Sequence, residues 1–302
     1  MFQFDDFESC LVTKGIDKAK AGASDQAELV SIGVPVFNGA KSLRAAIAGL
    51  LAQTYQNIEL IISDNCSTDE TRRICEAFAA QDKRIKCFRQ AENIGAARNF
   101  RFVLEQARGK YFLWNAGDDT RSPDYVAVNV AFLEAHPDYC ASTSRARDEG
   151  GRFNPRWMGD RALSQARAED RILTYFKGWH RNAIFYSMYR REVLVANPVL
   201  YGPEHLGQDW TMIIQLAKSA KFQRLDQGEL VLGTGGISKS IRHLRSMRKR
   251  PIEFIFPHWQ LIMFLKEASK DFSFWGRMRL CFRAWALDTR ANLGRLIHIF
   301  NW

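Results

Sequence analysis

Short apolar runs rich in β-branched residues alternate along the first half of this chain with segments that repeat apolar residues every three or four positions. Such runs are typical of buried strands, and the repeating segments are typical of amphipathic helices. The expected strands cover 29–38, 58–63, 84–88 and 110–114. The expected helices cover 41–53, 69–80 and a segment that opens at 92–99 and ends near 107. This alternation predicts an α/β fold with a mostly parallel sheet and helices on both faces.

Polar clusters at the ends of these strands are the candidate functional residues. They are Asn38, the segment 64–69, the segment 92–99, and the adjacent pair Asp118 and Asp119. Ligands of open parallel sheets bind beyond the carboxyl ends of the strands, so we expect these clusters to face one site. Two adjacent aspartates repel each other unless a cation lies between them, and a divalent metal that holds a diphosphate is the natural cation. The alternative is a solvated loop with an aspartate that caps the next helix.

Four motifs contain these clusters. They are Val-Ser-Ile-Gly-Val-Pro-Val-Phe-Asn at 30–38, Ser-Asp-Asn-Cys-Ser-Thr-Asp-Glu-Thr at 63–71, Glu-Asn-Ile-Gly-Ala-Ala-Arg-Asn at 92–99 and Gly-Asp-Asp at 117–119. Each motif is a weak signal alone, but together, in this order, they resemble a family 2 glycosyltransferase over about 29–236. The resemblance implies the GT-A fold, a Rossmann-like sheet, and an inverting sugar transfer from a nucleotide-sugar donor.

The resemblance also implies roles for individual residues of the nucleotide-sugar site. The residues that would line the base and ribose pocket are Pro35, Phe37 and Asn38. The residues that would shape the diphosphate and sugar side are Asn93, Gly95 and Arg98. Asp64 would accept a hydrogen bond from a base N–H. This suits the imide of uracil and favours a UDP-sugar, although guanine and thymine also present such a donor.

The aspartate motif departs from the family pattern. The family often has Asp-x-Asp-Asp, and here the first position is Ala116. Aligned by distance from the preceding strand, Asp118 is the expected ligand of the metal and of the nucleotide sugar. Asp119, beside it, is the second residue assigned to the metal site and could act there indirectly. The metal would then be Mg²⁺ or Mn²⁺, held mainly by one protein oxygen and the diphosphate.

The candidate catalytic base lies in the second half of the chain. Gln208-Asp209 looks like the family's Glu-Asp segment, and Asp209 would take the proton from the acceptor hydroxyl. Asp209 could instead cap the helix expected to start at Trp210, and both roles can hold together. The next strand is expected at 221–225. The family often has a histidine after this strand, but 232–238 contain none.

The C-terminal segment carries most of the net charge. We divide the 302 residues into a flexible N-terminal extension at 1–27, a GT-A catalytic domain at 28–238 and a basic amphipathic helical tail at 239–302. The tail has 13 Lys or Arg and 4 Asp or Glu, which gives +9 of the chain's formal +10. Basic residues interleaved with tryptophan and phenylalanine at helical spacing are typical of a helix that lies in an anionic membrane interface. The longest stretch without Asp, Glu, Lys or Arg is 14 residues, short of the roughly 20 that a spanning helix needs.

These features predict a glycosyltransferase that is cytoplasmic and peripheral on the inner face of the cell membrane. Its expected acceptor is a polyprenyl-linked or other glycan. The tail could instead pack on the catalytic domain or on a second copy, so a homo-oligomer stays open. No nucleic-acid partner is expected, because no such module is recognisable.

Two alternative functions remain from the sequence. A nucleotidyltransferase of related fold would need a glycine-rich phosphate loop after the first strand, and 34–40 do not form one. The second alternative is a catalytically weak or inactive membrane-associated scaffold. Ala116 in place of the family's first aspartate is consistent with it, whereas the presence of Asp118 and Asp209 argues for an active enzyme.

Overall fold

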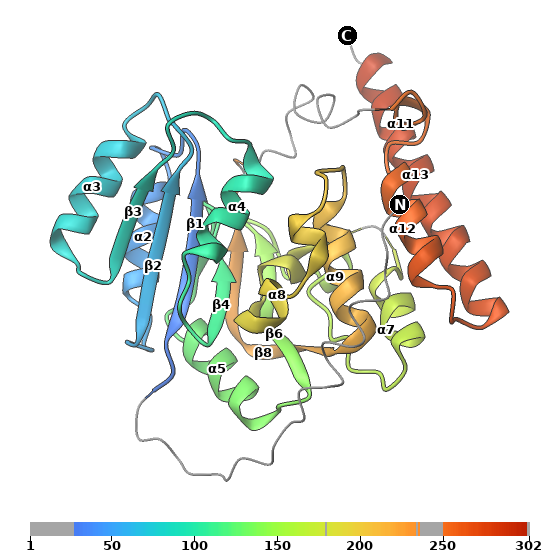
Figure 1. The fold of residues 1–302 in the computed structure, drawn as a ribbon, viewed down its shortest axis with the longest axis horizontal. Coiled ribbons are helices and arrows are strands. Elements are labelled where there is room, and N and C mark those ends of the chain that lie inside the picture. The colour runs from blue at the N-terminus through green and yellow to red at the C-terminus, as the bar shows by residue number, and fades with distance from the viewer. Residues whose placement is uncertain (1–26, 179, 234, 236–249, 301–302) are drawn as a thin grey trace.

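Within the part of the chain that the structure describes, the sheet has eight strands in the order β3-β2-β1-β4-β7-β6-β8-β5. Figure 1 shows the fold. The structure is a computed structural model that describes residues 27–178, 180–233, 235 and 250–300. The strands are β1 (Val30–Val36), β2 (Ile58–Asp64), β3 (Ile85–Arg89), β4 (Tyr111–Trp114), β5 (Thr120–Arg121), β6 (Tyr139–Asp148), β7 (Met188–Arg190) and β8 (Lys221–Leu232). The expectations that fall on 1–26 and 239–249 lie outside the described residues.

The first four strands form the parallel half of the sheet that the sequence predicts. β1 lies between β2 and β4 and is parallel to both, and β3 is parallel to β2. The helices that follow these strands are α2 (Leu43–Leu51), α3 (Thr71–Gln81), α4 (Ala96–Glu105) and α5 (Tyr125–Ala135). β1 and β2 are buried along their whole length, as expected for strands covered on both faces. The predicted α/β fold with a mostly parallel sheet is confirmed.

Two clusters of apolar side chains cover the two faces of this sheet. Alternate residues of a strand point to opposite faces, so neighbours in β4 belong to different clusters. Leu113 packs with α2, α3 and α5 on one face. Phe112 and Trp114 pack on the other face with α4, α7 (Ala168–Tyr175) and α9 (Gln208–Ser219). The strand ends that carry the polar motifs are therefore held by a core on each side.

Gly33 lies in β1 where α4 approaches the sheet. A methyl group there would lie 2.6 Å from Val103 Cγ2 and 2.7 Å from Phe112 Cζ. Because both neighbours are fully buried, Gly33→Ala is expected to lower the free energy of unfolding by about 1–3 kcal/mol, the usual cost of overpacking. Urea denaturation measures this loss. Gly49→Ala in α2 is the control, since nothing lies within 4 Å of its added methyl; equal losses in both variants would contradict the steric explanation.

The second half of the sheet is mixed, and the sequence pattern predicts it only in part. β7 is antiparallel to β4 and β6, and β6 is parallel to β8. The expected strand at 221–225 is the first part of the longer β8. The hydrophobic pattern gives no indication of β6 or β7.

In the described part of the chain after residue 249, the helices are α11 (Ile252–Ile255), α12 (Trp259–Ala268) and α13 (Phe274–Phe300). α12 and α13 lie beside α9 and α7 (Figure 1). Leu261 and Leu265 of α12 and Leu280 of α13 are buried in the same cluster as Trp210 of α9. One side of the predicted tail thus belongs to the same apolar cluster as α7 and α9. Within the described ranges, no helix is both long enough and apolar enough to cross a bilayer.

Candidate active site

The loops after β1 and β2 are joined by side-chain hydrogen bonds. Asn38 is the centre of this contact, because its N–H donates to Ser67 Oγ at 2.9 Å and its Oδ1 accepts from the N–H of Thr68 at 2.9 Å. Its backbone is left-handed, with φ of +50°, a conformation that asparagine tolerates better than most residues. Phe37, just before it, is 44% exposed, while Pro35 is buried within β1. Of the expected base-pocket residues, Phe37 therefore presents an apolar surface to solvent.

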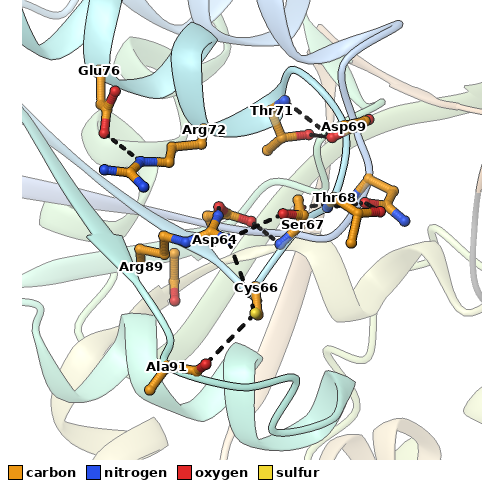
Figure 2. Close-up of polar contacts among 12 residues, drawn as sticks. Asp64, Cys66, Ser67, Thr68, Asp69, Thr71, Arg72, Glu76, Arg89 and Ala91 are labelled. Carbon is orange, nitrogen blue, oxygen red and sulfur yellow. Dashed lines mark hydrogen bonds and ion pairs between the residues drawn. The ribbon is translucent and has the colours of Figure 1, made fainter.

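Asp64 is held inside the protein at the end of β2 (Figure 2). One carboxylate oxygen accepts from the N–H of Ser67 at 2.9 Å, and the other pairs with the guanidinium of Arg89 at 2.5 Å. The residue is only 2% exposed. The carboxylate thus orders the loop, and its expected contact with a nucleotide base stays a prediction.

The segment before α4 lies against the same loop. Asn65, which belongs to the polar cluster at 64–69, is 3% exposed and donates from Nδ2 to Asn93 Oδ1 at 3.0 Å. Asn93 Oδ1 also accepts from the N–H of Gly95 at 3.0 Å. Gly95 has φ of +86° and precedes the first residue of α4, which favours glycine at this turn. The structure therefore brings the second and third motifs together.

The Asp-Asp loop completes this group of loops. Ser42 Oγ, at the start of α2, donates to the carbonyl of Gly117 at 2.8 Å. Asp118 is half-buried and accepts from the N–H of Gly235 at 2.7 Å. Asp119 is 3% exposed and accepts from the N–H of Gly233 at 3.0 Å. Gly233 and Gly235, which follow β8, therefore supply backbone N–H groups to the two aspartates, at the place where the family often has a histidine.

The two aspartates differ in what they can offer a metal. The other oxygen of Asp119 accepts from the N–H of Ala116 at 3.3 Å, and burial raises the pKa of Asp119 to about 6. Among the described residues, only one oxygen of Asp118 accepts a hydrogen bond, from the N–H of Gly235. Among the described residues no group of three side chains forms a ready metal site. The donor set fits a divalent ion bound chiefly through the Asp118 carboxylate and a substrate diphosphate.

Two buried polar residues that the sequence analysis missed support this loop. Asn115 is fully buried and donates to the carbonyl of Asp119 at 3.0 Å. Arg121 donates to Asn115 Oδ1 at 3.0 Å and to the carbonyl of Trp114 at 2.7 Å. The nearby positive charge of Arg121 partly offsets the effect of burial on the pKa of Asp119. A signal existed in the sequence, since an arginine follows the Asp-Asp pair by two residues.

Arg98, at the start of α4, lies beside the segment 201–208. It lines a cavity of about 430 Å³ together with Tyr201, Glu204 and Gln208. Its guanidinium lies 3.7 Å from the carboxylate of Glu204. This places Arg98 beside the segment that carries Asp209, while its expected contact with the donor stays a prediction.

Asp209 lies in the first turn of α9. The helix begins at Gln208, two residues earlier than expected, and its N-cap is Gly207 with φ of +85°. Asp209 is therefore not the N-cap residue, contrary to the alternative considered from the sequence. It is half-buried, and its Oδ2 accepts from Asn182 Nδ2 at 2.8 Å. Burial raises the pKa of Asp209, and the hydrogen bond from Asn182 opposes this effect.

Residues 31–196 match the sequence profile of Glycosyl transferase family 2. The chain belongs to this family. Glycosyltransferase GlyG of Streptococcus pneumoniae is 40% identical over 92 residues, which are 30% of this chain and 31% of that protein. The putative glycosyltransferase EpsE of Bacillus subtilis is 37% identical over 111 residues, or 36% of this chain and 40% of that protein. The matches thus span well under half the length of these curated relatives.

Solved structures share the GT-A-like fold. S. aureus TarS 1–349 in complex with UDP-GlcNAc superposes with a TM-score of 0.62 at 18% identity, covering 83% of this chain and 70% of that one. The mannosyltransferase PcManGT from Pyrobaculum calidifontis, in complex with GDP-Man and Mn²⁺, has a TM-score of 0.54 at 16% identity, covering 87% and 72%. At sequence identities this low, the structural similarity shows that the fold is shared and nothing more.

Proposed function

We propose that this family 2 glycosyltransferase transfers a sugar from a nucleotide-diphosphate donor to a hydroxyl of a lipid-linked glycan, with inversion at the anomeric carbon. The observation that carries the proposal is the joining of the four motif loops at one edge of the sheet. There Phe37 is exposed and Asp118 is the more accessible of the two aspartates. Similar folds hold UDP-GlcNAc in TarS and GDP-Man in PcManGT, which supports a nucleotide sugar as the donor.

The donor would lie across the loops after β1, β2 and β4. Phe37 offers a ring for the base. A carboxylate has about four acceptor sites, so Asp64 can accept from a base N–H while it keeps its bonds to Ser67 and Arg89. A UDP-sugar therefore stays the favoured donor, because the imide N–H of uracil can donate to Asp64. Asn93 and Gly95 would shape the diphosphate side.

A divalent Mg²⁺ or Mn²⁺ would be held by Asp118 and the diphosphate, and when bound it would neutralise charge on the leaving nucleoside diphosphate. Asp119 acts through the loop, because its oxygens accept from backbone N–H groups. Asp209 would take the proton of the acceptor hydroxyl. The acceptor oxygen forms the new bond to the anomeric carbon as the bond to the phosphate oxygen breaks on the opposite face.

The acceptor is inferred from the exposed face of α13. Its apolar stripe consists of Phe274, Trp275, Met278, Phe282 and Trp285, each more than half exposed. At 100° per residue these five positions fall within an arc of about 100°. Exposed Arg277 and Arg279 flank the stripe, and no acidic residue occurs between 274 and 286. The opposite side, with Leu280 and Ala284, is buried against the catalytic domain.

An anionic lipid surface fits this stripe better than water does. Exposed apolar rings bordered by arginines are the pattern of an interfacial helix, and each basic residue near an anionic surface contributes about 1 kcal/mol. A lipid-linked acceptor, such as a polyprenyl-linked glycan, would then share the surface with the enzyme. A second copy of the chain is the other partner that could cover the stripe.

The function is tested with a panel of nucleotide sugars. Donor binding should raise the melting temperature in Mn²⁺, because a ligand that binds only the folded state stabilises it. Incubation with the stabilising donor and membrane lipid extract should release nucleoside diphosphate and yield a product of inverted anomeric configuration. Release of pyrophosphate would indicate a nucleotidyltransferase, and donor binding without any turnover would indicate a scaffold.

Membrane attachment is tested by co-sedimentation with liposomes. The triple variant Trp275→Ser, Phe282→Ser, Trp285→Ser is expected to partition at least about tenfold less than wild type into anionic vesicles, since a loss of 1.4 kcal/mol already gives this factor. Attachment should weaken with salt and with neutral lipid. Phe153→Ser is the control, as Phe153 is exposed but lies outside α13.

Point variants are preferable to truncation of the tail. Removal of α12 would expose the core around Leu261 and Leu265, so it would confound attachment with stability. Unchanged partitioning of the triple variant would contradict the membrane proposal. A concentration-dependent dimer that the same variant dissociates would assign the stripe to a second copy.

A further inference from the structure

Asn182 connects the proposed base to the interior of the protein. It is 2% exposed and lies just before η1 (Ala183–Tyr186), far in sequence from every motif described above. Its Nδ2 donates to Asp209 Oδ2 at 2.8 Å, and its Oδ1 accepts from the hydroxyl of Tyr175 at 2.6 Å. Tyr175 is itself fully buried at the end of α7. A chain of two hydrogen bonds therefore leads from α7 to the carboxylate on α9.

The chemistry of the three groups fixes the orientation of the amide. An ionised carboxylate only accepts hydrogen bonds, so Asn182 must present its NH₂ group to Asp209. The carbonyl oxygen of Asn182 then faces Tyr175, whose hydroxyl can donate to it. The opposite orientation would place the carbonyl oxygen against the carboxylate. Tyr175 therefore keeps the donor of Asn182 directed at Asp209.

The backbone at Asn182 is held just as firmly. Its φ is +56°, and its N–H donates to His180 Nδ1 at 3.0 Å. His180 stacks on Trp210, the residue after Asp209, with ring centroids 4.3 Å apart. Burial lowers the pKa of His180 to about 3, so its ring is neutral and can accept this hydrogen bond. A glycine would suit the backbone here, but only the side chain of asparagine supplies the donor.

We propose that Asn182, directed by Tyr175, is a positioning residue that holds the Asp209 carboxylate in place for proton abstraction. This inference rests on the proposed role of Asp209 as the base. It adds a residue that no motif of the chain indicates, and it assigns a function to the buried asparagine that precedes η1.

The proposal has a consequence for the pH dependence of transfer. Among the described residues, the titratable groups that interact with Asp209 include His205 in the preceding loop, Tyr175 on α7 and Tyr186 on η1. His258, the N-cap residue of α12, lies beside Gly207, two residues before Asp209. Burial raises the pKa of Asp209, and the Asn182 donor lowers it. Loss of the donor should therefore raise this pKa further. A higher pKa leaves less of the base ionised at a given pH, so the acid limb of kcat/KM should move to higher pH.

Asn182→Asp is the sharpest variant. Aspartate tolerates the left-handed backbone, but it replaces the donor with a second carboxylate next to Asp209. Like charges that share a site raise one pKa strongly, so the acid limb should move up by about one pH unit or more, with activity recovering as the pH rises. Tyr175→Phe keeps Asn182 but frees its amide to turn, and a smaller shift in the same direction is expected.

Asn197→Asp is the matched control. Asn197 is 1% exposed, and its Nδ2 lies 3.4 Å from the carbonyl of Met212 on the same helix α9. In the described structure its side chain bonds to the backbone of Met212 and Val199 and not to Asp209, so its replacement should lower the melting temperature without moving the acid limb.

The outcomes separate this inference from the proposed function. Upward shifts in both Asn182→Asp and Tyr175→Phe, with none in the control, would support the positioning role. Acid limbs that stay in place in both variants would overturn it, whatever happens to stability. If Asp209→Asn retained wild-type transfer, the assignment of the base would fail, and the role of Asn182 would fail with it.

Discussion

Replacement of Asp209 by asparagine is expected to lower the rate of transfer by a factor on the order of 10² or more, while donor affinity stays nearly unchanged. The amide cannot take the proton from the acceptor hydroxyl. The fold should tolerate the change, because the new side chain can still accept from Asn182 through its carbonyl oxygen. Single-turnover rates and donor titrations measure the two effects separately.

The melting temperature distinguishes this role from a structural one. Because the N-cap of α9 is Gly207, loss of the charge in the first turn should cost only about 0.3–1 kcal/mol through the helix dipole. Asp226→Asn is a control at an exposed carboxylate on β8. A large fall in the melting temperature with donor binding lost as well would favour a structural role. A product with retained anomeric configuration would also contradict base catalysis by Asp209.

The parallel half of the fold could be predicted because each of its elements carries its own local pattern. β1 and β2 are continuous apolar runs, and helices of the expected period follow them. β6 is different, since its buried stretch includes Ser142, Thr143 and Ser144. These hydroxyls are satisfied by distant partners such as the side chain of Asn129. A strand buried through such contacts shows no apolar alternation, so the hydrophobic pattern misses it.

The C-terminal helices show a second limit of pattern reading. Leu280 and Trp285 are both apolar residues of α13, yet Leu280 is 2% exposed and Trp285 is 59% exposed. A helical repeat of apolar residues indicates that a helix has an apolar face. It does not indicate which apolar residues pack against α7 and α9. The choice depends on tertiary packing. Core packing therefore involves one side of α13, and the membrane attachment that we propose would involve the opposite side.

The sequence indicated those candidate residues that lie in a motif at the end of a strand. It did not indicate the residues from other parts of the chain that hold them in place. Asn38, Asp64 and Asp118 occur in motifs at β1, β2 and β4. The partner of Asp64 is Arg89, 25 residues away, and the partner of Asp209 is Asn182, 27 residues away. Such pairings arise only when the sheet order places separate segments together.

Replacement of Asp118 by asparagine is expected to abolish transfer and to weaken nucleotide-sugar binding in Mg²⁺ or Mn²⁺. The amide can still accept from the N–H of Gly235, so the loop should keep its shape. A neutral amide is a poorer ligand beside a diphosphate, however, and the metal would lose its main protein oxygen. Calorimetric titration of the donor with Mn²⁺ and with EDTA measures the loss.

Asp119→Asn provides the comparison that isolates metal binding from loop structure. Asp119 is buried and accepts from Gly233 and Ala116, so an amide there loses one acceptor and should lower stability, with a smaller effect on transfer than Asp118→Asn. The dependence of donor affinity on Mn²⁺ should persist in Asp119→Asn and disappear in Asp118→Asn. Wild-type turnover by Asp118→Asn with the metal still required would mean that the ion is held elsewhere. Because Asp118 is the more accessible carboxylate of the pair, the affinity for metal should reside in its side chain.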